Sequence, residues 1–358
     1  MLTATGCKAG TQGLTKFIRR FVASVCFAVV PWHSALAADA ACPPLPAALA
    51  VLAASWVEQC KNPLCGRVFD TGAKTVSPAC ASATWQPLID RIKTTLDAGG
   101  TTALGEVHDN PVHHTLRAAL LGQTKAVVFE QIRGDKKAAL EAFASAKTAG
   151  STVEKAKDLM ARVAWDASGW PADLYRPLVE AAMSINARIY AGDAASDAMK
   201  ALSMGEKGFA TPAERARLKL DVPLGPQLEE ASLIEIEQAH CGMMPKSAFG
   251  GMADAQRYRD AQLSDAVIEA AAAQGHAVLI AGNGHVRKDR GVPWYLGQRR
   301  PDKPVLSVML IEVEDGNTDP LSYVPHDPGG KPVTDFIVFT PPTQRGDPCE
   351  KFRKKKAG

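Results

Sequence analysis

Short, almost uninterrupted apolar runs alternate with helix-like segments over residues 85–345 of this chain. Runs this apolar are typical of strands buried on both faces, and strands that alternate with helices generally form a parallel sheet. We therefore expect an α/β fold, with a largely parallel central sheet flanked by helices. The strands are predicted at 102–107, 125–132, 185–191, 276–281, 305–313 and 335–339.

The helical segments are too long to serve only as crossovers between these strands. Helical spacing is found at 87–98, 112–121, 135–147, 153–163 and 171–183, and residues 197–273 are almost wholly helix-like. We expect one or both of the blocks 135–183 and 197–273 to form a smaller helical cap. The last two strands are candidates for antiparallel pairing at an edge of the sheet.

The first 37 residues have the build of a cleavable signal peptide. A basic stretch is followed by an apolar run at 21–30 and by small residues at 35–37. A transmembrane helix needs about 20 apolar residues, roughly twice the length of this run. We therefore expect an exported, periplasmic protein. Lipid attachment at Cys42 is the less favoured alternative, because Asp39 stands where a lipid-attachment motif has a branched apolar residue.

Six cysteines follow residue 37, and an even number in an exported chain favours disulfides. Three bridges can pair in about 15 ways, and the sequence does not choose among them. Four of the six lie in a Cys-rich N-terminal segment, residues 38–84, which we expect to be cross-linked, with no free thiols. A zinc site is less favoured, because the closest pair has four intervening residues. The six are Cys42, Cys60, Cys65, Cys80, Cys241 and Cys349.

The formal net charge of +3 does not describe the body of the chain. Four Lys or Arg and no Asp or Glu lie in residues 1–37, and residues 38–349 hold 32 Lys or Arg against 37 Asp or Glu. Five more cations lie near the end of a basic tail predicted at 346–358. A slightly acidic body without a basic and aromatic stripe argues against nucleic acid as a partner.

Ligand-type side chains follow three of the predicted strands. Glu106 and His108 belong to the first strand end, Glu130 to the second and His285 to the fourth. Ligands of open parallel sheets bind at the carboxyl ends of the strands, so these side chains mark the candidate site. A carboxylate within an apolar run is costly unless it is paired, which favours a functional role for both glutamates.

Two chemistries fit these side chains. His108, Glu130 and His285 could bind a divalent metal ion that activates water. Alternatively, a Glu and a His could act as general acid and base without metal. A third interpretation is structural, with each imidazole donating to a backbone carbonyl. For three other histidines the structural role weighs about as heavily: His113, His114 and His240.

The ordered motifs of the chain resemble those of a known family. They are LGEVHDNPVHH at 104–114, FEQ at 129–131, SGWP at 168–171, YRP at 175–177, HCG at 240–242, AQRYRD at 255–260, AGNGHVR at 281–287 and GVP at 291–293. In number and order, over about residues 66–350, they resemble the ChaN-like haem-binding uptake family of the Tiki superfamily.

The resemblance implies an exported bacterial protein with a parallel sheet between helices. It further implies haem binding for iron acquisition, with two haems stacked face to face in a homodimer and outer-membrane haem uptake machinery as a partner. In ChaN-like proteins the iron is bound by a tyrosine, which is a recognised axial ligand. Tyr175 is the best match, because it lies in the YRP motif. The other candidates for the haem pocket are Tyr258, Tyr295, His108, His114 and His285.

The same resemblance keeps a hydrolase open as the alternative. Other members of the superfamily are metal-dependent proteases or erythromycin-esterase-like hydrolases that use His and Glu. Carried onto this chain, the set for a metal-dependent hydrolase is Glu106, His108, Glu130 and His285. Haem propionates would need local cations, because the body of the chain is acidic. Three arginines are candidates for this role: Arg176, Arg257 and Arg287.

Overall fold

The computed structural model describes residues 45–76, 81–146, 149–203, 210–347 and 349–350 of the chain. The predicted signal peptide, Cys42, Cys80 and the basic tail beyond residue 350 lie outside these ranges. No helix within them is long and apolar enough to cross a membrane.

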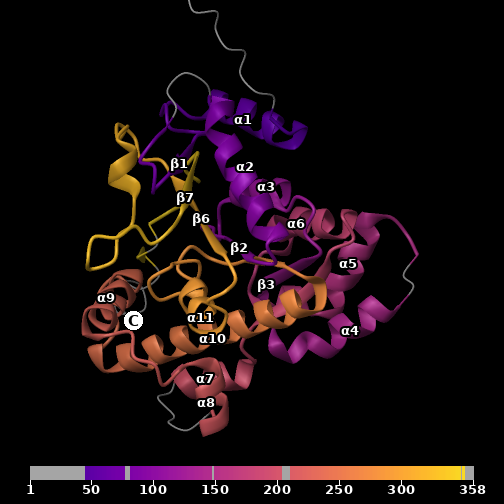
Figure 1. Cartoon of the computed structure of the whole chain (residues 1–358), viewed down its shortest axis with the longest axis vertical. Helices are drawn as coiled ribbons and strands as arrows, with labels where there is room; N and C mark the ends of the chain where they lie inside the picture. The colour runs from indigo at the N-terminus through magenta and orange to yellow at the C-terminus, as the bar shows by residue number, and fades with distance from the viewer. Residues whose placement is uncertain (1–44, 77–80, 147–148, 204–209, 348, 351–358) are drawn as a thin grey trace, which may run out of the picture. The chain divides into compact units, whose positions relative to one another are not determined.

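Seven strands of the described residues form one sheet, in the order β1-β7-β6-β2-β5-β3-β4 (Figure 1). Each neighbouring pair is parallel except β1 and β7. The predicted α/β class and largely parallel sheet are therefore confirmed. The strands are β1 Val68–Asp70, β2 Thr101–Leu104, β3 Ala126–Arg133, β4 Arg188–Asp193, β5 Ala277–Ile280, β6 Val305–Glu312 and β7 Phe336–Thr340.

The antiparallel edge of the sheet comes from β1 and not from the last two strands. β6 and β7 pair in parallel, with Val308 opposite Phe336. Val68 of β1 instead pairs with Val338 of β7 in the antiparallel sense. The expectation for the last two strands is thus corrected. A strand of three residues is too short for periodicity to reveal it.

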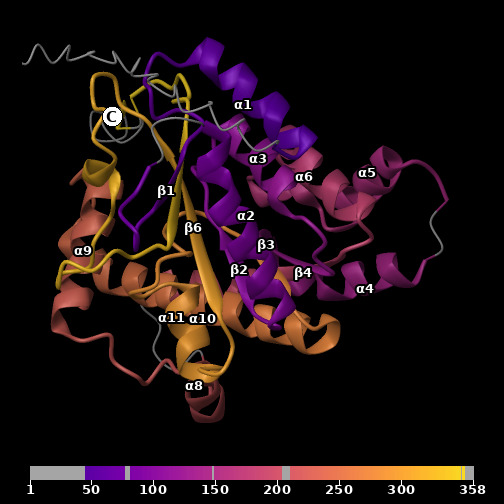
Figure 2. The same cartoon turned by 45° about the horizontal axis from the view of Figure 1, so that its top comes forward.

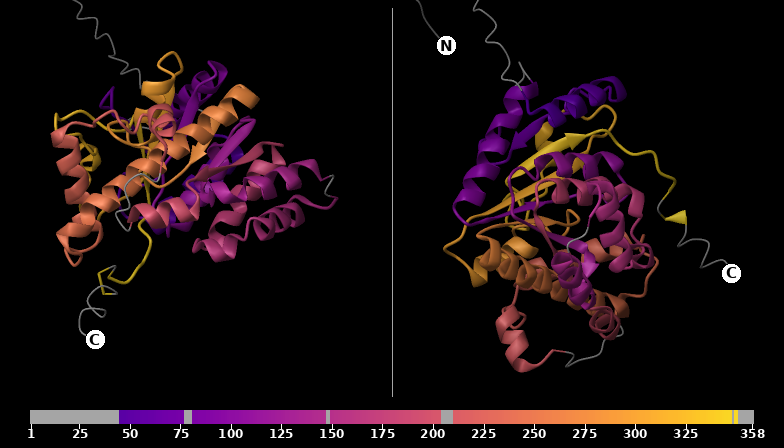
Figure 3. Two further views of the ribbon diagram at one scale, coloured as in Figure 1. Left: turned by 90° about the horizontal axis from the view of Figure 1, so that it is seen from below. Right: turned by 90° about the vertical axis from the view of Figure 1, so that its right-hand side faces the viewer.

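Helices cover both faces of the sheet (Figure 2). Side chains of β3 alternate between the two cores, because Val127 and Phe129 pack on one side and Val128 on the other. Figure 3 shows the long helix α10 running across the second face. The first face is covered by α1 (Ala47–Gln59), α2 (Ala81–Asp97), α3 (Pro111–Leu120), α5 (Thr152–Arg162) and α6 (Ala172–Ser184); the second is covered by α10 (Phe249–Gln274) and α11 (Val292–Arg299).

The helices that precede α10 build the helical cap that the sequence predicts. Three of them pack on α10 and not on the sheet: α7 (Ser196–Ser203), α8 (Pro212–Leu218) and α9 (Pro226–Ala239). The remaining helix, α4 (Lys137–Ser145), packs beside β4 and α5. Short 3₁₀ turns lie at Gly134–Lys136, Trp165–Ser168, Lys246–Ala248 and Pro320–Tyr323.

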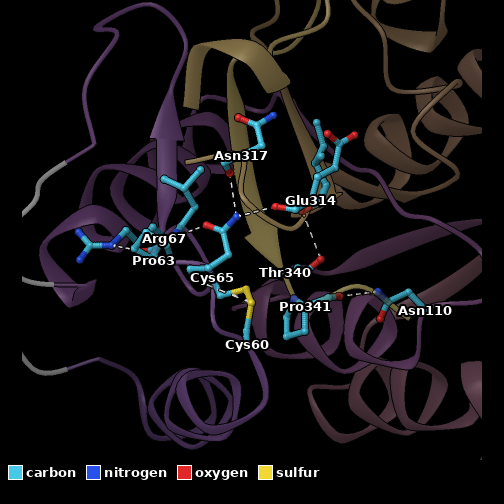
Figure 4. The surroundings of a disulfide bond; sticks show 12 residues. Cys60, Pro63, Cys65, Arg67, Asn110, Glu314, Asn317, Thr340 and Pro341 are labelled. Atoms are coloured by element: carbon cyan, nitrogen blue, oxygen red, sulfur yellow. Dashed lines mark hydrogen bonds between the residues drawn. A yellow bond between two sulfur atoms is a disulfide. The ribbon is translucent and has the colours of Figure 1, made fainter. Parts of the chain in front are cut away.

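Two disulfides are formed by the described cysteines. Cys60 pairs with Cys65 within the predicted Cys-rich segment, next to the chain that follows β6 (Figure 4). Cys241, just after α9, pairs with Cys349, 108 residues further along the chain. The predicted use of cysteines in disulfides is therefore confirmed for these four.

Candidate functional site

A cavity of about 660 Å³ lies at the carboxyl ends of β2, β5 and β3, with α9 and α10 as further walls. This volume is within the range of small-molecule and cofactor sites. The four side chains that the sequence places at strand ends all line it: Glu106, His108, Glu130 and His285. They come together because β2, β5 and β3 are neighbours in the sheet.

The loop after β2 brings His108 to the cavity because a helix begins directly behind it. The Asn110 side chain accepts a hydrogen bond from the Val112 N–H (2.9 Å), and Pro111 occupies the first turn of α3. Both features are preferred at helix N-termini. The start of α3 is thereby fixed, and with it the position of the loop.

Glu106 is a buried carboxylate that several donors share. It accepts hydrogen bonds from Oη of Tyr175 (2.7 Å) and Nδ1 of His108 (2.8 Å), and it forms an ion pair with the buried Arg117. Burial alone would raise the pKa of Glu106, but the Arg117 charge and the bond from His108 outweigh burial and lower that pKa. The carboxylate is therefore ionised, and it holds the imidazole of His108 in one orientation.

His108 presents a lone pair to the cavity. Because Nδ1 donates to Glu106, the neutral ring carries its lone pair on Nε2, which makes no hydrogen bond within the described residues. The side chain is 45% exposed, and its ring meets Trp170 edge-on at 4.6 Å between centroids. A Cβ at Gly282 would lie 2.7 Å from Cε1 and 3.0 Å from Nε2 of His108, so this ring position requires glycine there.

Glu130 and His285 form a second buried charged group. Glu130 accepts from the Gly282 N–H (2.7 Å) and from Arg259 (2.6 Å). The ring of His285 lies between two carboxylates, with Nε2 3.2 Å from Glu130 and Nδ1 2.6 Å from Asp260. Burial alone would lower the pKa of His285, but these carboxylates raise it to about 10. His285 is thus a cation at neutral pH.

The predicted metal set is not assembled. Among the residues that the structure describes, no three His, Cys, Asp or Glu side chains are grouped so that they could hold a metal ion. Both ring nitrogens of His285 face carboxylates, and a histidine must be deprotonated to bind a metal. The interpretation of His108, Glu130 and His285 as metal ligands stays a prediction that this geometry does not support.

None of the three predicted tyrosine ligands lines the cavity. Tyr175 is fully buried, with its hydroxyl bonded to Glu106, and burial raises its pKa. Tyr258 faces α8, and Tyr295 is buried beside Arg257 with its pKa raised by burial to about 12. This arrangement does not favour a phenolate ligand at any of the three positions. Tyr175 as the iron ligand stays a prediction, with its hydroxyl bonded to Glu106 in this structure.

The two histidines of α3 have structural roles. His114 donates from Nε2 to the carbonyl of His108 (3.0 Å), and burial lowers its pKa to about 4. His113 accepts from the Val107 N–H and bonds Thr340, each at 2.8 Å. Both are fully buried and neither lines the cavity, so His114 as a haem-pocket residue stays a prediction that this structure does not support. His240, at the end of α9, does line the cavity.

Sequence reasoning missed most of the arginines that build the site. It did not single out Arg117, which faces Glu106, or Arg259, which joins Glu130 to Asp193. Arg290 was missed as well, although it lines the cavity. The AQRYRD motif contains Arg259, so the sequence offered a signal for this one of the three arginines. Among the predicted propionate partners, Arg257 lines the cavity, whereas Arg176 and Arg287 do not.

The fold agrees with comparisons to known proteins. The family model described as haem-binding uptake, Tiki superfamily, ChaN matches residues 94–296, more than half of the chain. The chain therefore belongs to this ChaN family of haem-binding uptake proteins. No curated protein matches the sequence significantly.

The chain is similar to several solved structures, and the first of these shares its fold. A structure described as cofacial haem binding to ChaN of Campylobacter jejuni matches with 18% identity and a TM-score of 0.54, over 75% of this chain and 94% of that chain. The type III effector HopBA1 matches with 14% identity and a TM-score of 0.35, over 71% and 94%. A mutant erythromycin esterase in its open conformation matches with 12% identity and a TM-score of 0.34, over 78% and 84%.

Proposed function

We propose that the protein binds haem in this cavity and that Nε2 of His108 would hold the iron. The observation that carries the proposal is the pairing of His108 with Glu106. A carboxylate that holds one ring nitrogen of a histidine fixes the tautomer and makes the other nitrogen a better ligand. Imidazole is a recognised axial ligand of haem iron. Membership of the family supplies the cofactor class.

The cavity wall suits a large apolar ring. Apolar atoms make up most of the lining surface of the cavity, and the indole of Trp170 is one of the lining groups, packed against His108. Cofactor sites are generally apolar surfaces with a few fixed polar groups. The apolar side chains that line the cavity include Trp170, Met199, Leu224, Ile236, Met252 and Ala255.

Arg290 is the group best placed to bind a propionate. Its guanidinium lines the cavity and is buried, and both terminal nitrogens lack hydrogen bonds within the described part of the chain. They only form ion pairs, with Glu235 and Asp289. Glu235 is half exposed, so it can return to water when an incoming carboxylate takes its place on the buried Arg290. When haem is bound, its iron supplies the ligand-exchange and redox chemistry of the site.

We further propose that the protein is exported and serves haem or iron uptake. The predicted signal peptide and the two disulfides support export, because disulfides persist in oxidising compartments. Campylobacter jejuni ChaN binds haem cofacially, which suggests that a second haem and a second copy of this chain complete the site.

A haemin titration of the purified protein tests the proposal. We expect a saturable Soret change that His108→Ala abolishes or strongly weakens. His326→Ala is the matched control, because this exposed histidine does not line the cavity, and it should leave the affinity unchanged. Wild-type affinity in His108→Ala, or no saturable change in the wild type, would refute the proposal.

A hydrolase that works without metal is the second candidate function. The same lone pair on His108 could take a proton from water, with Glu106 stabilising the imidazolium. Turnover of a fluorogenic ester that is abolished by His108→Ala and unaffected by chelators would support this function. No turnover above the His108→Ala level would exclude it for that ester class.

A further inference from the structure

One wall of the cavity is a weakly held helix. α9 contributes Ser232, Glu235 and Ile236 to the lining, yet none of its 14 residues is buried. Its apolar Leu233 and Ile234 are 36% and 48% exposed. Helices of this length are marginal in water and depend on tertiary packing of an apolar face. Contacts other than a buried face must therefore hold α9 in place.

The ion pairs of α9 supply only part of that hold. Glu235 contacts Arg287 at 3.3 Å and forms a second ion pair with Arg290. Both arginines are buried, but they share one carboxylate that is 50% exposed and therefore screened by water. The other side of α9 packs beside the beginning of α10 (Figure 1).

A covalent contact lies at the end of α9. Cys241 is two residues beyond the helix and is joined to Cys349. We call residues 341–347 together with Cys349 the strap. Because the strap follows β7, the disulfide ties α9 to the central sheet through the last part of the chain.

The strap is anchored a second time, at the opposite wall of the cavity. Arg345 donates to Asp109 with Nε (2.8 Å) and Nη2 (2.7 Å), and to Glu312 with Nη1 (2.7 Å). Asp109 is the neighbour of His108 in the loop after β2. The strap therefore connects the His108 loop with α9, so that both walls of the cavity are held by one segment.

We infer that the strap is a redox-controlled fastener: while the Cys241–Cys349 disulfide is intact it holds α9 against the cavity, and its reduction frees α9 and opens the ligand site. The identity of the ligand rests on the proposed function, whereas the fastening of α9 does not. Reduction removes the covalent contact and leaves α9 with the ion pairs of the half-exposed Glu235 and with its packing beside α10, in which none of its residues is buried.

The reductant is a dithiol. One of its thiolates attacks a sulfur of the bridge, the bond between Cys241 and Cys349 breaks, and a mixed disulfide forms with one of them while the other leaves as a thiolate. The second thiol of the reductant then displaces the mixed disulfide. Two electrons and two protons pass to the cysteines, and the dithiol becomes a cyclic disulfide. Both cysteines are partly exposed, so the bridge is accessible to this attack.

Hydrogen exchange of the haem-free protein tests the fastening directly. In Cys241→Ser/Cys349→Ser, or after treatment with dithiothreitol, amides of residues 226–239 should exchange at least about tenfold faster than in the oxidised wild type. The matched control is Cys60→Ser/Cys65→Ser, which removes the other described bridge, neither of whose cysteines lines the cavity. Equal exchange of α9 in wild type and Cys241→Ser/Cys349→Ser would overturn the inference.

Transfer of haem to excess apomyoglobin tests the consequence. From haemin-loaded protein, transfer should be at least about tenfold faster in Cys241→Ser/Cys349→Ser than in wild type or in the Cys60→Ser/Cys65→Ser control. Faster exchange of α9 with unchanged transfer would overturn the gating role. If the wild type binds no haemin, the proposed function fails, and the exchange experiment still decides whether the bridge fastens α9.

Discussion

Replacing Glu106 by Gln tests whether the Glu106 carboxylate compensates the buried charge of Arg117. Arg117 is fully buried, and its Nε and Nη1 make no hydrogen bond within the described residues. Glu106 is the carboxylate paired with it. Breaking a buried ion pair by removing one charge costs about 3–5 kcal/mol, because the other charge is left uncompensated. We expect Glu106→Gln to lower the free energy of unfolding by about this amount.

Urea denaturation followed by tryptophan fluorescence measures this change. The matched control is Asp97→Asn, which makes the same carboxylate-to-amide change in an exposed pair with Lys93. Exposed helical pairs of this spacing contribute about 0.3–0.5 kcal/mol. A loss below about 1 kcal/mol in Glu106→Gln would refute the argument that Arg117 depends on Glu106.

The same substitution should also weaken haem binding in the folded fraction. An amide holds the Nδ1–H of His108 less strongly than a carboxylate does, so the lone pair on Nε2 is no longer fixed. Loss of such a partner typically costs about 10–100-fold in metal affinity. The haemin titration should show a weakening of this size. Wild-type affinity in folded Glu106→Gln would contradict the role of Glu106 in orienting His108.

The groups around the cavity also determine the response to pH and to two further substitutions. The pKa of His285 is raised to about 10 in the folded state, so its contribution to stability is complete below about pH 6.5 and is lost as the pH rises towards 10. Urea unfolding should show a steeper loss over that range in wild type than in His285→Gln, and equal slopes would contradict this. Tyr175→Phe removes one hydrogen bond to the Glu106 carboxylate and should lower the free energy of unfolding by about 1.5–3 kcal/mol; no measurable change would contradict the buried bond. Gly282→Ala places a methyl carbon 2.7 Å from Cε1 of the half-exposed His108 ring, which can turn away but only by losing its bond to Glu106. Haemin affinity should fall about tenfold with little change in Tm, and unchanged affinity would argue against His108 as the ligand.

The strands of the fold could be predicted because burial on both faces leaves an apolar run in the sequence. Val127, Val128 and Phe129 illustrate this, since successive side chains pack into opposite cores. The three-residue β1 carries no such signal. Its place at the edge depends on pairing with β7, which begins 268 residues further along the chain. Short edge strands are set by tertiary contacts.

The strand-end site could be predicted in outline because topology brings carboxyl ends of neighbouring parallel strands together. Glu106, Glu130 and His285 illustrate this: each belongs to a different strand end and all line one cavity. Which of them carry charge could not be predicted. The cationic state of His285 depends on Asp260, a residue of α10 that no local pattern connects to it.

The role of Tyr175 illustrates the limit of reasoning from motifs. Its motif suggested a ligand, but burial is decided by packing, and the hydroxyl meets a carboxylate 69 residues away in the chain. The phenol therefore supports Glu106, which in turn holds His108. Tyr175 therefore acts indirectly, through Glu106, on the histidine that we propose as the ligand.

Rescue by free imidazole tests the central claim most directly. His108→Gly would leave a gap at the rim of the cavity where the ring now meets Trp170. We predict that this variant lacks the wild-type Soret spectrum with haemin and that added imidazole, which fills the gap and supplies the missing nitrogen, restores it. A His108→Gly variant that shows the wild-type spectrum without imidazole would contradict the assignment of His108 as the haem ligand.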